Sequence, residues 1–180
     1  MSETPLVSVI LPVHNEENYI SDAIGSLTRQ YYDNIELIIV DDYSSDKTPD
    51  IIEDLQQDDS RIRILRNDTN MGQSFSANRG ALDSQGKYLI FHDGDDLSTL
   101  DRIEKQVEFL KNNPDVGVVG GATFYINPKR DQRIIRRRPV NDNDIRKGLS
   151  RECTINTAAA MFRRDALFGT RLFESKIEEG

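Results

Sequence analysis

Short apolar runs alternate with amphipathic segments along most of this chain, and this alternation constrains the fold more than any other feature. None of the runs has helical periodicity, which indicates strands buried on both faces. The segments between them repeat apolar residues at helical spacing. The expected strands are 7–13, 35–40, 61–66 (an edge strand) and 88–91, and the expected helices are 19–30, a segment starting at 48, 74–84 and a segment starting at 103. The pattern predicts an α/β fold, a mainly parallel, doubly wound, Rossmann-like sheet flanked by helices.

Single residues add finer expectations about these elements. Pro12 has no N–H, so it should stop the first strand from pairing as a central strand at that point. Thr48, with a proline behind it, is typical of a helix N-cap. In the third helix Ala77, Ala81 and Leu82 are expected to face the sheet, where small residues allow close packing.

The alternation becomes less regular after residue 119. Residues 127–143 contain five arginines and are interpreted first as a solvated or mobile surface loop. A functional alternative is that these arginines meet a diphosphate, an anionic acceptor or a membrane surface. Residues 158–162 predict one more strand, followed by a short helix at 163–168. A chain of 180 residues is expected to form a single domain spanning 1–180.

Composition excludes several classes of function. The formal net charge of −8 argues against a nucleic-acid partner, because phosphate backbones are bound by basic surfaces. Cys153 is the only cysteine, which excludes an internal disulfide and a cysteine-rich zinc site. No apolar run approaches the roughly 20 residues of a membrane span, and the N-terminus does not look like a signal peptide. We therefore expect no transmembrane segment and a cytoplasmic location.

The strand at 88–91 is followed at once by an acidic cluster. Asp93, Asp95 and Asp96 occur within four residues, and Gly94 lets the chain turn between them. The cluster should lie at the carboxyl edge of the sheet, where α/β folds bind ligands. Carboxylates this close repel one another unless a cation lies between them, and oxygen ligands suit Mg²⁺ or Mn²⁺. The alternative is an acidic turn that caps the next helix, because residues 98–101 resemble a weak capping box.

A second acidic pair, Asp41 and Asp42, follows the strand at 35–40. No glycine-rich phosphate loop occurs in the chain, so a dinucleotide fold and a P-loop are disfavoured. A nucleotide site remains whose phosphates are neutralised by a metal at the fourth strand. There Asp42 could accept a hydrogen bond from a ring N–H, as in uracil. The alternative is that Asp42 is an ordinary turn residue.

Taken together, four motifs resemble those of family 2 inverting glycosyltransferases with the GT-A fold. They are VSVILPVHN at 7–15, IELIIVDD at 35–42, NRG at 78–80 and GKYLIFHDGDD at 86–96. They occur in the family's order and cover nearly the whole chain. The resemblance implies an enzyme that transfers a sugar from a nucleotide-sugar, by preference a UDP-sugar, to a hydroxyl of a glycan or lipid-linked acceptor. It also implies a role in the synthesis of cell-surface polysaccharide.

The resemblance also assigns roles to individual residues. It implies nucleotide binding by Pro12, Val13, His14, Asn15, Asp42, Asn78, Asp93 and Gly94, and binding of divalent Mn or Mg by Asp95 and Asp93. His14 stands where the family usually has tyrosine, and Thr157 stands where it often has histidine. Ala77 replaces an arginine that many members carry, which removes one phosphate contact.

The catalytic base of such enzymes is a carboxylate that takes the proton of the acceptor hydroxyl, so that the product has inverted configuration. In the family it follows a glycine that matches Gly180. The resemblance therefore implies that the base lies beyond Gly180 and that the domain is truncated there. Glu178 and Glu179 match poorly as substitutes. We expect the chain to bind donor and to transfer sugar barely or not at all, with peripheral contact at the inner face of the membrane as one option.

Two other functions remain open on the sequence. A haloacid-dehalogenase-like phosphatase also has Asp-x-Asp after an apolar strand, but near the start of its domain. A non-catalytic nucleotide-sugar-binding module would bind the same ligands without turnover. His92 is expected to be a packed strand residue, and Cys153 a structural one.

Overall fold

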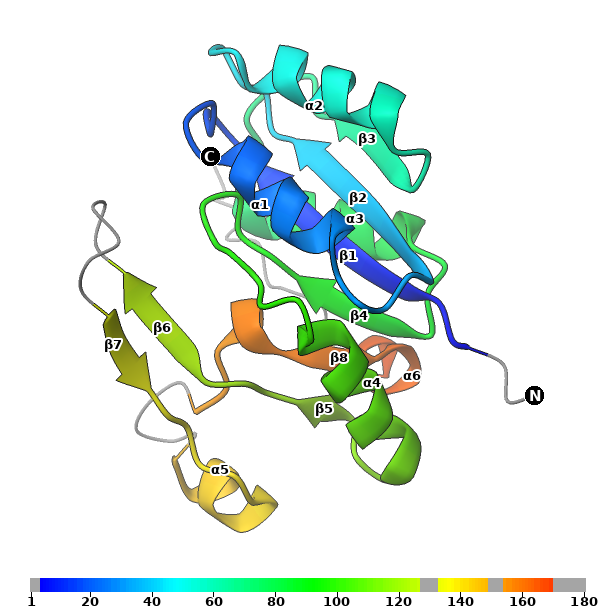
Figure 1. Ribbon diagram of the computed structural model, residues 1–180, viewed down its shortest axis with the longest axis vertical. Coiled ribbons are helices and arrows are strands. Elements are labelled where there is room, and N and C mark those ends of the chain that lie inside the picture. The colour runs from blue at the N-terminus through cyan, green and yellow to red at the C-terminus, as the bar shows by residue number, and fades with distance from the viewer. Residues whose placement is uncertain (1–3, 127–132, 149–153, 170–180) are drawn as a thin grey trace, which may run out of the picture.

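The computed structural model describes residues 4–126, 133–148 and 154–169, and a six-stranded sheet forms its centre (Figure 1). The strand order is β3-β2-β1-β4-β8-β5. β1 to β4 are parallel, and β8 runs antiparallel to both of its neighbours. The strands are β1 (Val7–Val13), β2 (Ile35–Asp41), β3 (Ile62–Arg66), β4 (Tyr88–Phe91), β5 (Val118–Val119) and β8 (Met161–Arg163). The expected mainly parallel α/β sheet, with β3 at its edge, is confirmed.

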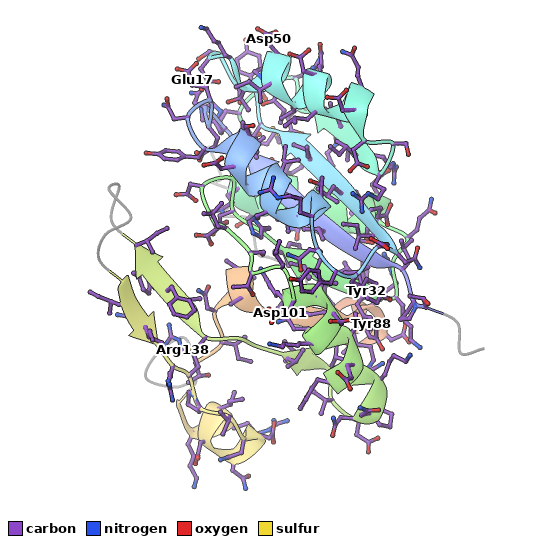
Figure 2. All side chains as sticks on the ribbon, in the orientation of Figure 1. Glu17, Tyr32, Asp50, Tyr88, Asp101 and Arg138 are labelled. Atoms are coloured by element: carbon purple, nitrogen blue, oxygen red, sulfur yellow. The ribbon has the colours of Figure 1, made fainter. Side chains whose placement is uncertain are left out.

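Helices cover both faces of this sheet (Figure 1). α1, α2 and α4 share one apolar cluster with β1 and β2, while α3 shares the other with Ile10 and Leu89, and the α6 residue Leu167 packs against it. Tyr88 is buried at the amino end of the sheet, near Tyr32 (Figure 2). The helices are α1 (Ile20–Thr28), α2 (Thr48–Asp58), α3 (Gln73–Asp83), α4 (Arg102–Asn112), α5 (Asp142–Gly148) and α6 (Arg164–Phe168), with a 3₁₀ turn η1 (Thr157–Ala159).

The chain changes direction within the sheet between β1 and β4. α1 and α2 lead to β2 and β3 on one side of β1, and α3 then crosses the opposite face to reach β4 on the other side. Carboxyl ends of strands that diverge at such a switch point form the ligand crevice of open α/β sheets. The β1–β4 ladder ends at the pair Ile10 and Phe91, so the crevice opens beyond these residues.

Pro12 lies in β1, which pairs with β2 on one side and with β4 on the other. β1 pairs with β2 along its whole length, so the expectation that Pro12 ends its pairing as a central strand is wrong on that side. Ile10 directs its carbonyl to β4, where it accepts from the His92 amide at 2.9 Å. Backbone groups two residues apart point the same way along a strand. The missing N–H of Pro12 therefore faces β4 beyond the end of that ladder, where it leaves no gap in the sheet.

α3 lies close to the sheet because its inner face is small. Ala77 and Ala81 are buried as expected, and a Cβ on Gly80 would come within 2.6 Å of the Ile10 Cγ2 atom. Leu82 is 67% exposed, so its predicted inward position is wrong. It directly follows Ala81, and neighbouring residues of a helix point about 100° apart.

Other local predictions need correction. Thr48 is the first residue of α2 rather than its cap, and its hydroxyl accepts from the Glu16 amide at 2.8 Å. This bond ties α2 to the loop after β1. The strand predicted at 158–162 is a 3₁₀ turn followed by β8. Part of the predicted arginine loop is strand, because β6 (Thr123–Ile126) and β7 (Arg133–Arg136) form an antiparallel hairpin. Among the described residues, no helix has the length and apolar character to cross a membrane.

Candidate functional site: a crevice at the carboxyl edge of the sheet

A cavity of about 340 Å³ lies at the carboxyl ends of β1, β2 and β4. It brings together most of the residues predicted for the site, because these parallel strands end at one edge of the sheet. Its lining is Pro12, Val13, His14, Glu16, Asp42, Gln73, Asp93, Gly94 and Asp95. Of the predicted residues, Asn15 and Asn78 are not in this lining. Asn78 lies half-buried in α3.

Asp42 is fixed by donors from the loop after β3 and from α3. Its Oδ1 accepts from the Asn67 side chain at 2.6 Å and from the Met71 amide at 2.8 Å, and its Oδ2 accepts from the Gly72 amide at 2.7 Å. Burial raises the pKa of the Asp42 carboxyl, but hydrogen bonds from these groups and from Ser76 outweigh it and hold the pKa below 3.8. Asp42 is therefore a charged, pre-oriented acceptor at the cavity wall.

His14 and Asn15 form the loop that leaves β1. The His14 Nδ1 atom lies 2.8 Å from the Asp42 carbonyl oxygen, which can only accept, so Nδ1 carries the hydrogen. This bond orients the imidazole at the cavity rim. Asn15 has a φ of 56°, and its Oδ1 accepts from the Ser45 amide at 2.8 Å. Asn15 shapes the turn, since asparagine tolerates this left-handed conformation.

The loop after β4 concentrates negative charge. Burial and then the charge of Asp95 raise the pKa of Asp93, although the Gln73 side chain donates to Asp93 Oδ1 at 2.9 Å. Burial and then Asp93 and Asp95 raise the pKa of Asp96, with Arg102 acting in the opposite sense. Burial also raises the pKa of Glu16, and the next largest cause is Asp95 across the cavity. Within the described ranges, no three His, Cys, Asp or Glu side chains are grouped to hold a metal by themselves.

His92 supports this loop from beneath. Its ring is buried, and Nδ1 donates to the Asp93 carbonyl oxygen at 2.8 Å. The Ser98 hydroxyl donates to Nε2 at 3.1 Å and accepts from Arg102 Nη1 at 2.9 Å. Burial, and secondly the charge of Arg102, lowers the pKa of His92 to about 4. The prediction of a packed His92 is confirmed. Ser98 holds His92 in place, and because α4 has Asp101 at its N-cap and no side-chain cap bond, the capping-box alternative is wrong.

Three residues of the site could not be predicted from apolar periodicity. They are Glu16, Gln73 and Asn67, polar residues in loops and at a helix start, where apolar residues follow no regular spacing. Gly72, which has a φ of 84° just before α3, is the feature that could have indicated a tight turn there. Gln73 also borders a second cavity of about 210 Å³, lined by Pro12, Gln73, Ser74, Ala77, Phe91, Asp93, Asn156, Thr157 and Ala158. Cys153, Glu178 and Glu179 lie outside the described residues.

Comparison with known proteins agrees with the family resemblance of the four sequence motifs. A sequence model of glycosyl transferase family 2 matches residues 8–168. An uncharacterized glycosyltransferase of Haemophilus influenzae is 40% identical over 120 residues, 67% of this chain and 48% of that protein. A putative teichuronic acid biosynthesis glycosyltransferase of Bacillus subtilis, TuaG, is 41% identical over 106 residues, 59% of this chain and 42% of that protein.

Solved structures agree in fold. The mannosyltransferase PcManGT from Pyrobaculum calidifontis, in complex with GDP-Man and Mn²⁺, has a TM-score of 0.73 at 21% identity over 98% of this chain and 49% of its own. S. aureus TarS residues 1–349, in complex with UDP-GlcNAc, has a TM-score of 0.58 at 27% identity over 62% of this chain and 32% of its own.

The matches cover a larger share of this chain than of its relatives. The chain spans about half the length of the curated relatives it matches, whereas the family model covers most of the chain. All residues that line the crevice lie within the part of the chain that the family model matches. This chain belongs to glycosyl transferase family 2.

Proposed function

We propose that the crevice binds a nucleoside diphosphate sugar together with a divalent cation, as the donor site of an inverting glycosyltransferase. One observation carries the proposal. Two acidic strand ends face one cavity, and hydrogen-bond donors surround Asp42, whereas burial and then the charge of Asp95 raise the pKa of Asp93. A nucleotide with a bound cation matches both ends, because its base offers donors and its metal offers positive charge.

The acidic loop fits a hard cation. Mg²⁺ and Mn²⁺ sites on nucleotides use one or two carboxylates and take further oxygen ligands from phosphates and water, so a three-residue protein cage is not needed. Asp95 and Asp93 would hold the ion, with Asp93 also oriented by Gln73. When bound, such an ion stabilises the charge of the leaving diphosphate. The Mn²⁺ complex of PcManGT, which shares the fold, supports this assignment.

The base would lie between Pro12, His14 and Asp42. A uracil N3–H donates to a carboxylate, and Asp42 is held charged and oriented by the loop at 71–72. UDP is therefore the preferred nucleotide, and TarS, which is solved with UDP-GlcNAc, supports this choice. PcManGT is solved with GDP-Man, so the test must include guanine.

For the transfer step we propose that an acceptor hydroxyl loses its proton to a carboxylate as its oxygen attacks the anomeric carbon from the face opposite the diphosphate. This inverts the configuration. The carboxylate would come from beyond Gly180, with Glu179 or Glu178 as the weaker candidates. The name of TuaG, a putative teichuronic acid biosynthesis glycosyltransferase, supports a glycan acceptor and a role in polysaccharide synthesis.

A thermal-shift panel tests the donor site. UDP, GDP and CDP are each added at the same concentration, with Mn²⁺ or with EDTA, and a nucleotide present at a hundredfold excess over its dissociation constant stabilises the fold by about 2.7 kcal/mol. We expect UDP with Mn²⁺ to give the largest shift. Asp95→Ala should remove the effect of Mn²⁺, and Asp42→Asn should reduce the preference for UDP over CDP. Asp68→Ala, an exposed carboxylate near the site, is the matched control. Equal shifts with Mn²⁺ and EDTA would reject the metal assignment.

A further inference from the structure

The β6–β7 hairpin lies beside the main sheet rather than within it (Figure 1), and it exposes large apolar side chains on both of its faces. Residues paired across two strands share a face, and the next pair lies on the other face. Phe124 and Ile135 pair on one face and are 52% and 51% exposed. Tyr125 and Ile134 pair on the other face and are 51% and 71% exposed.

This two-sided exposure limits what can cover the hairpin. A flat protein surface, including that of a second copy, covers one face of a two-stranded ribbon and leaves the other in water. A medium into which the hairpin inserts removes the apolar side chains of both faces from water. The boundary between lipid headgroups and acyl chains is such a medium, and aromatic side chains favour it.

The charge of the hairpin complements an anionic surface. The described residues 123–126 and 133–138 contain four arginines and no acidic residue, although the whole chain has a net charge of −8. Arg136 and Arg137 are exposed, and the Arg136 guanidinium lies 5.4 Å from the centre of the Tyr125 ring. Arg138 follows at the base of the hairpin, toward α5 (Figure 2). Val140, the next apolar residue, is 96% exposed.

We propose that the β6–β7 hairpin docks this protein on an anionic lipid bilayer, with its apolar side chains at the headgroup boundary and its arginines on the lipid phosphates. Arginine side chains can reach outward from a buried stem to such phosphates. Basic residues near an anionic leaflet and apolar burial in the interface add to each other in binding. The hairpin contributes no residue to the lining of the nucleotide crevice, so this inference is independent of the donor proposal.

Vesicle co-sedimentation tests the proposal. Unilamellar vesicles of phosphatidylcholine alone, or with 30% phosphatidylglycerol, are titrated against the chain at low and high salt. We expect binding to the anionic vesicles only, with loss at high salt. Arg136→Gln with Arg137→Gln should lower the partition coefficient by a factor of about 25, since each basic residue near such a surface contributes roughly fivefold. Ile134→Ser with Ile135→Ser should lower it by at least tenfold through lost apolar burial.

Matched substitutions on the main body serve as controls. Leu82→Ser removes an exposed apolar residue, and Arg29→Gln with Lys111→Gln removes two exposed charges, so neither variant should change the partition coefficient. All variants should keep the circular-dichroism spectrum and the cooperative thermal unfolding of the unchanged chain, which shows that they fold. Failure to bind anionic vesicles at low salt would overturn the proposal, and so would equal binding by hairpin variants and controls. A dimer that the Ile134→Ser and Ile135→Ser changes dissociate would instead assign the hairpin to contact between copies.

Discussion

Two acidic strand ends lie at the same edge of the sheet, and the protein treats them in opposite ways. After β2, backbone and side-chain donors surround Asp42 and hold its pKa below the ordinary value. After β4, burial and the mutual repulsion of Asp93, Asp95 and Asp96 raise the pKa of Asp93 and Asp96. The residue type and the position at a strand end are the same, so the neighbours make the difference.

The contrast separates two uses of a carboxylate. At Asp42 the negative charge serves the fold, because it organises the loop that carries Met71 and Gly72. At the β4 loop, the charge is a cost to the isolated protein that a bound cation would relieve. α3 joins the two ends, since Gln73 donates to Asp93 and Ser76 accepts from the Asn67 amide that also bonds Asp42.

The largest expected effect comes from Asp42→Ala. It leaves the Asn67 side chain and the amides of Met71 and Gly72 without their acceptor, and buried unsatisfied groups cost about 1–3 kcal/mol each. Some of these groups will find water, so we expect the free energy of unfolding to fall by about 3 kcal/mol in urea denaturation. Asp68→Ala should change it by less than about 0.5 kcal/mol, as surface substitutions do. Equal losses in the two variants would remove the structural role of Asp42.

Gly80→Ala tests the element that joins the two ends. The added methyl would lie 2.6 Å from the Ile10 Cγ2 atom and 3.1 Å from Val40 Cγ2, so α3 must move or the core must shift. Overpacking typically costs 1–3 kcal/mol, against roughly 1 kcal/mol gained in helix propensity. We expect a net loss of about 1.5 kcal/mol and a weaker nucleotide-induced thermal shift. Leu82→Ala, on the exposed side of α3, is the control and should leave that thermal shift unchanged.

Asp93→Asn should change the free energy of unfolding in the opposite direction to Asp42→Ala. The amide oxygen can still accept from Gln73, but one charge leaves the cluster. Like charges a few ångströms apart repel by on the order of 1 kcal/mol when water screens them. The free energy of unfolding without metal should therefore rise by about that amount, measured in EDTA. The same variant should lose the extra stabilisation that Mn²⁺ and UDP give the unchanged chain. A fall in metal-free stability would show that the cluster is already compensated within the protein.

The sequence was sufficient to predict where the first four strands lie in the chain and that the acidic residues lie at strand ends. Apolar runs such as 35–40 and 88–91 are long enough to identify as strands, and acidic residues directly after them must lie at the carboxyl edge. The direction of β8 was not predictable. A three-residue strand has no pattern of its own, and its antiparallel pairing depends on how the chain returns through residues 120–160.

The polar contacts around the site were harder to predict from the sequence than the position of the site. The sequence places Asp42 and Asp93 at strand ends, but it does not show that Asn67 and Gln73 reach them from 25 and 20 residues away. Such polar contacts follow no period, and they arise only when α3 lies on the sheet. The hairpin was missed for a related reason, because its isoleucines form a pair within an arginine-rich segment and its second face is also apolar.

The smallest expected effect is on the way the free energy of unfolding depends on pH, through the ionisation of Asp42. Its pKa in the folded protein lies below the ordinary 3.8, so ionised Asp42 contributes stability at pH values above 3.8 and this contribution is lost as the pH falls through the folded-state pKa. Asp42→Asn cannot ionise and lacks this dependence. The difference in unfolding free energy between the two proteins should be constant from pH 5 to 7 and should shrink below about pH 4. Urea denaturation at stepped pH measures the difference directly and cancels the other carboxylates, which titrate in both proteins. A difference that stays constant down to pH 2.5 would mean that Asp42 acts through its shape and hydrogen bonds alone, and that the two acidic strand ends differ less in charge than their surroundings indicate.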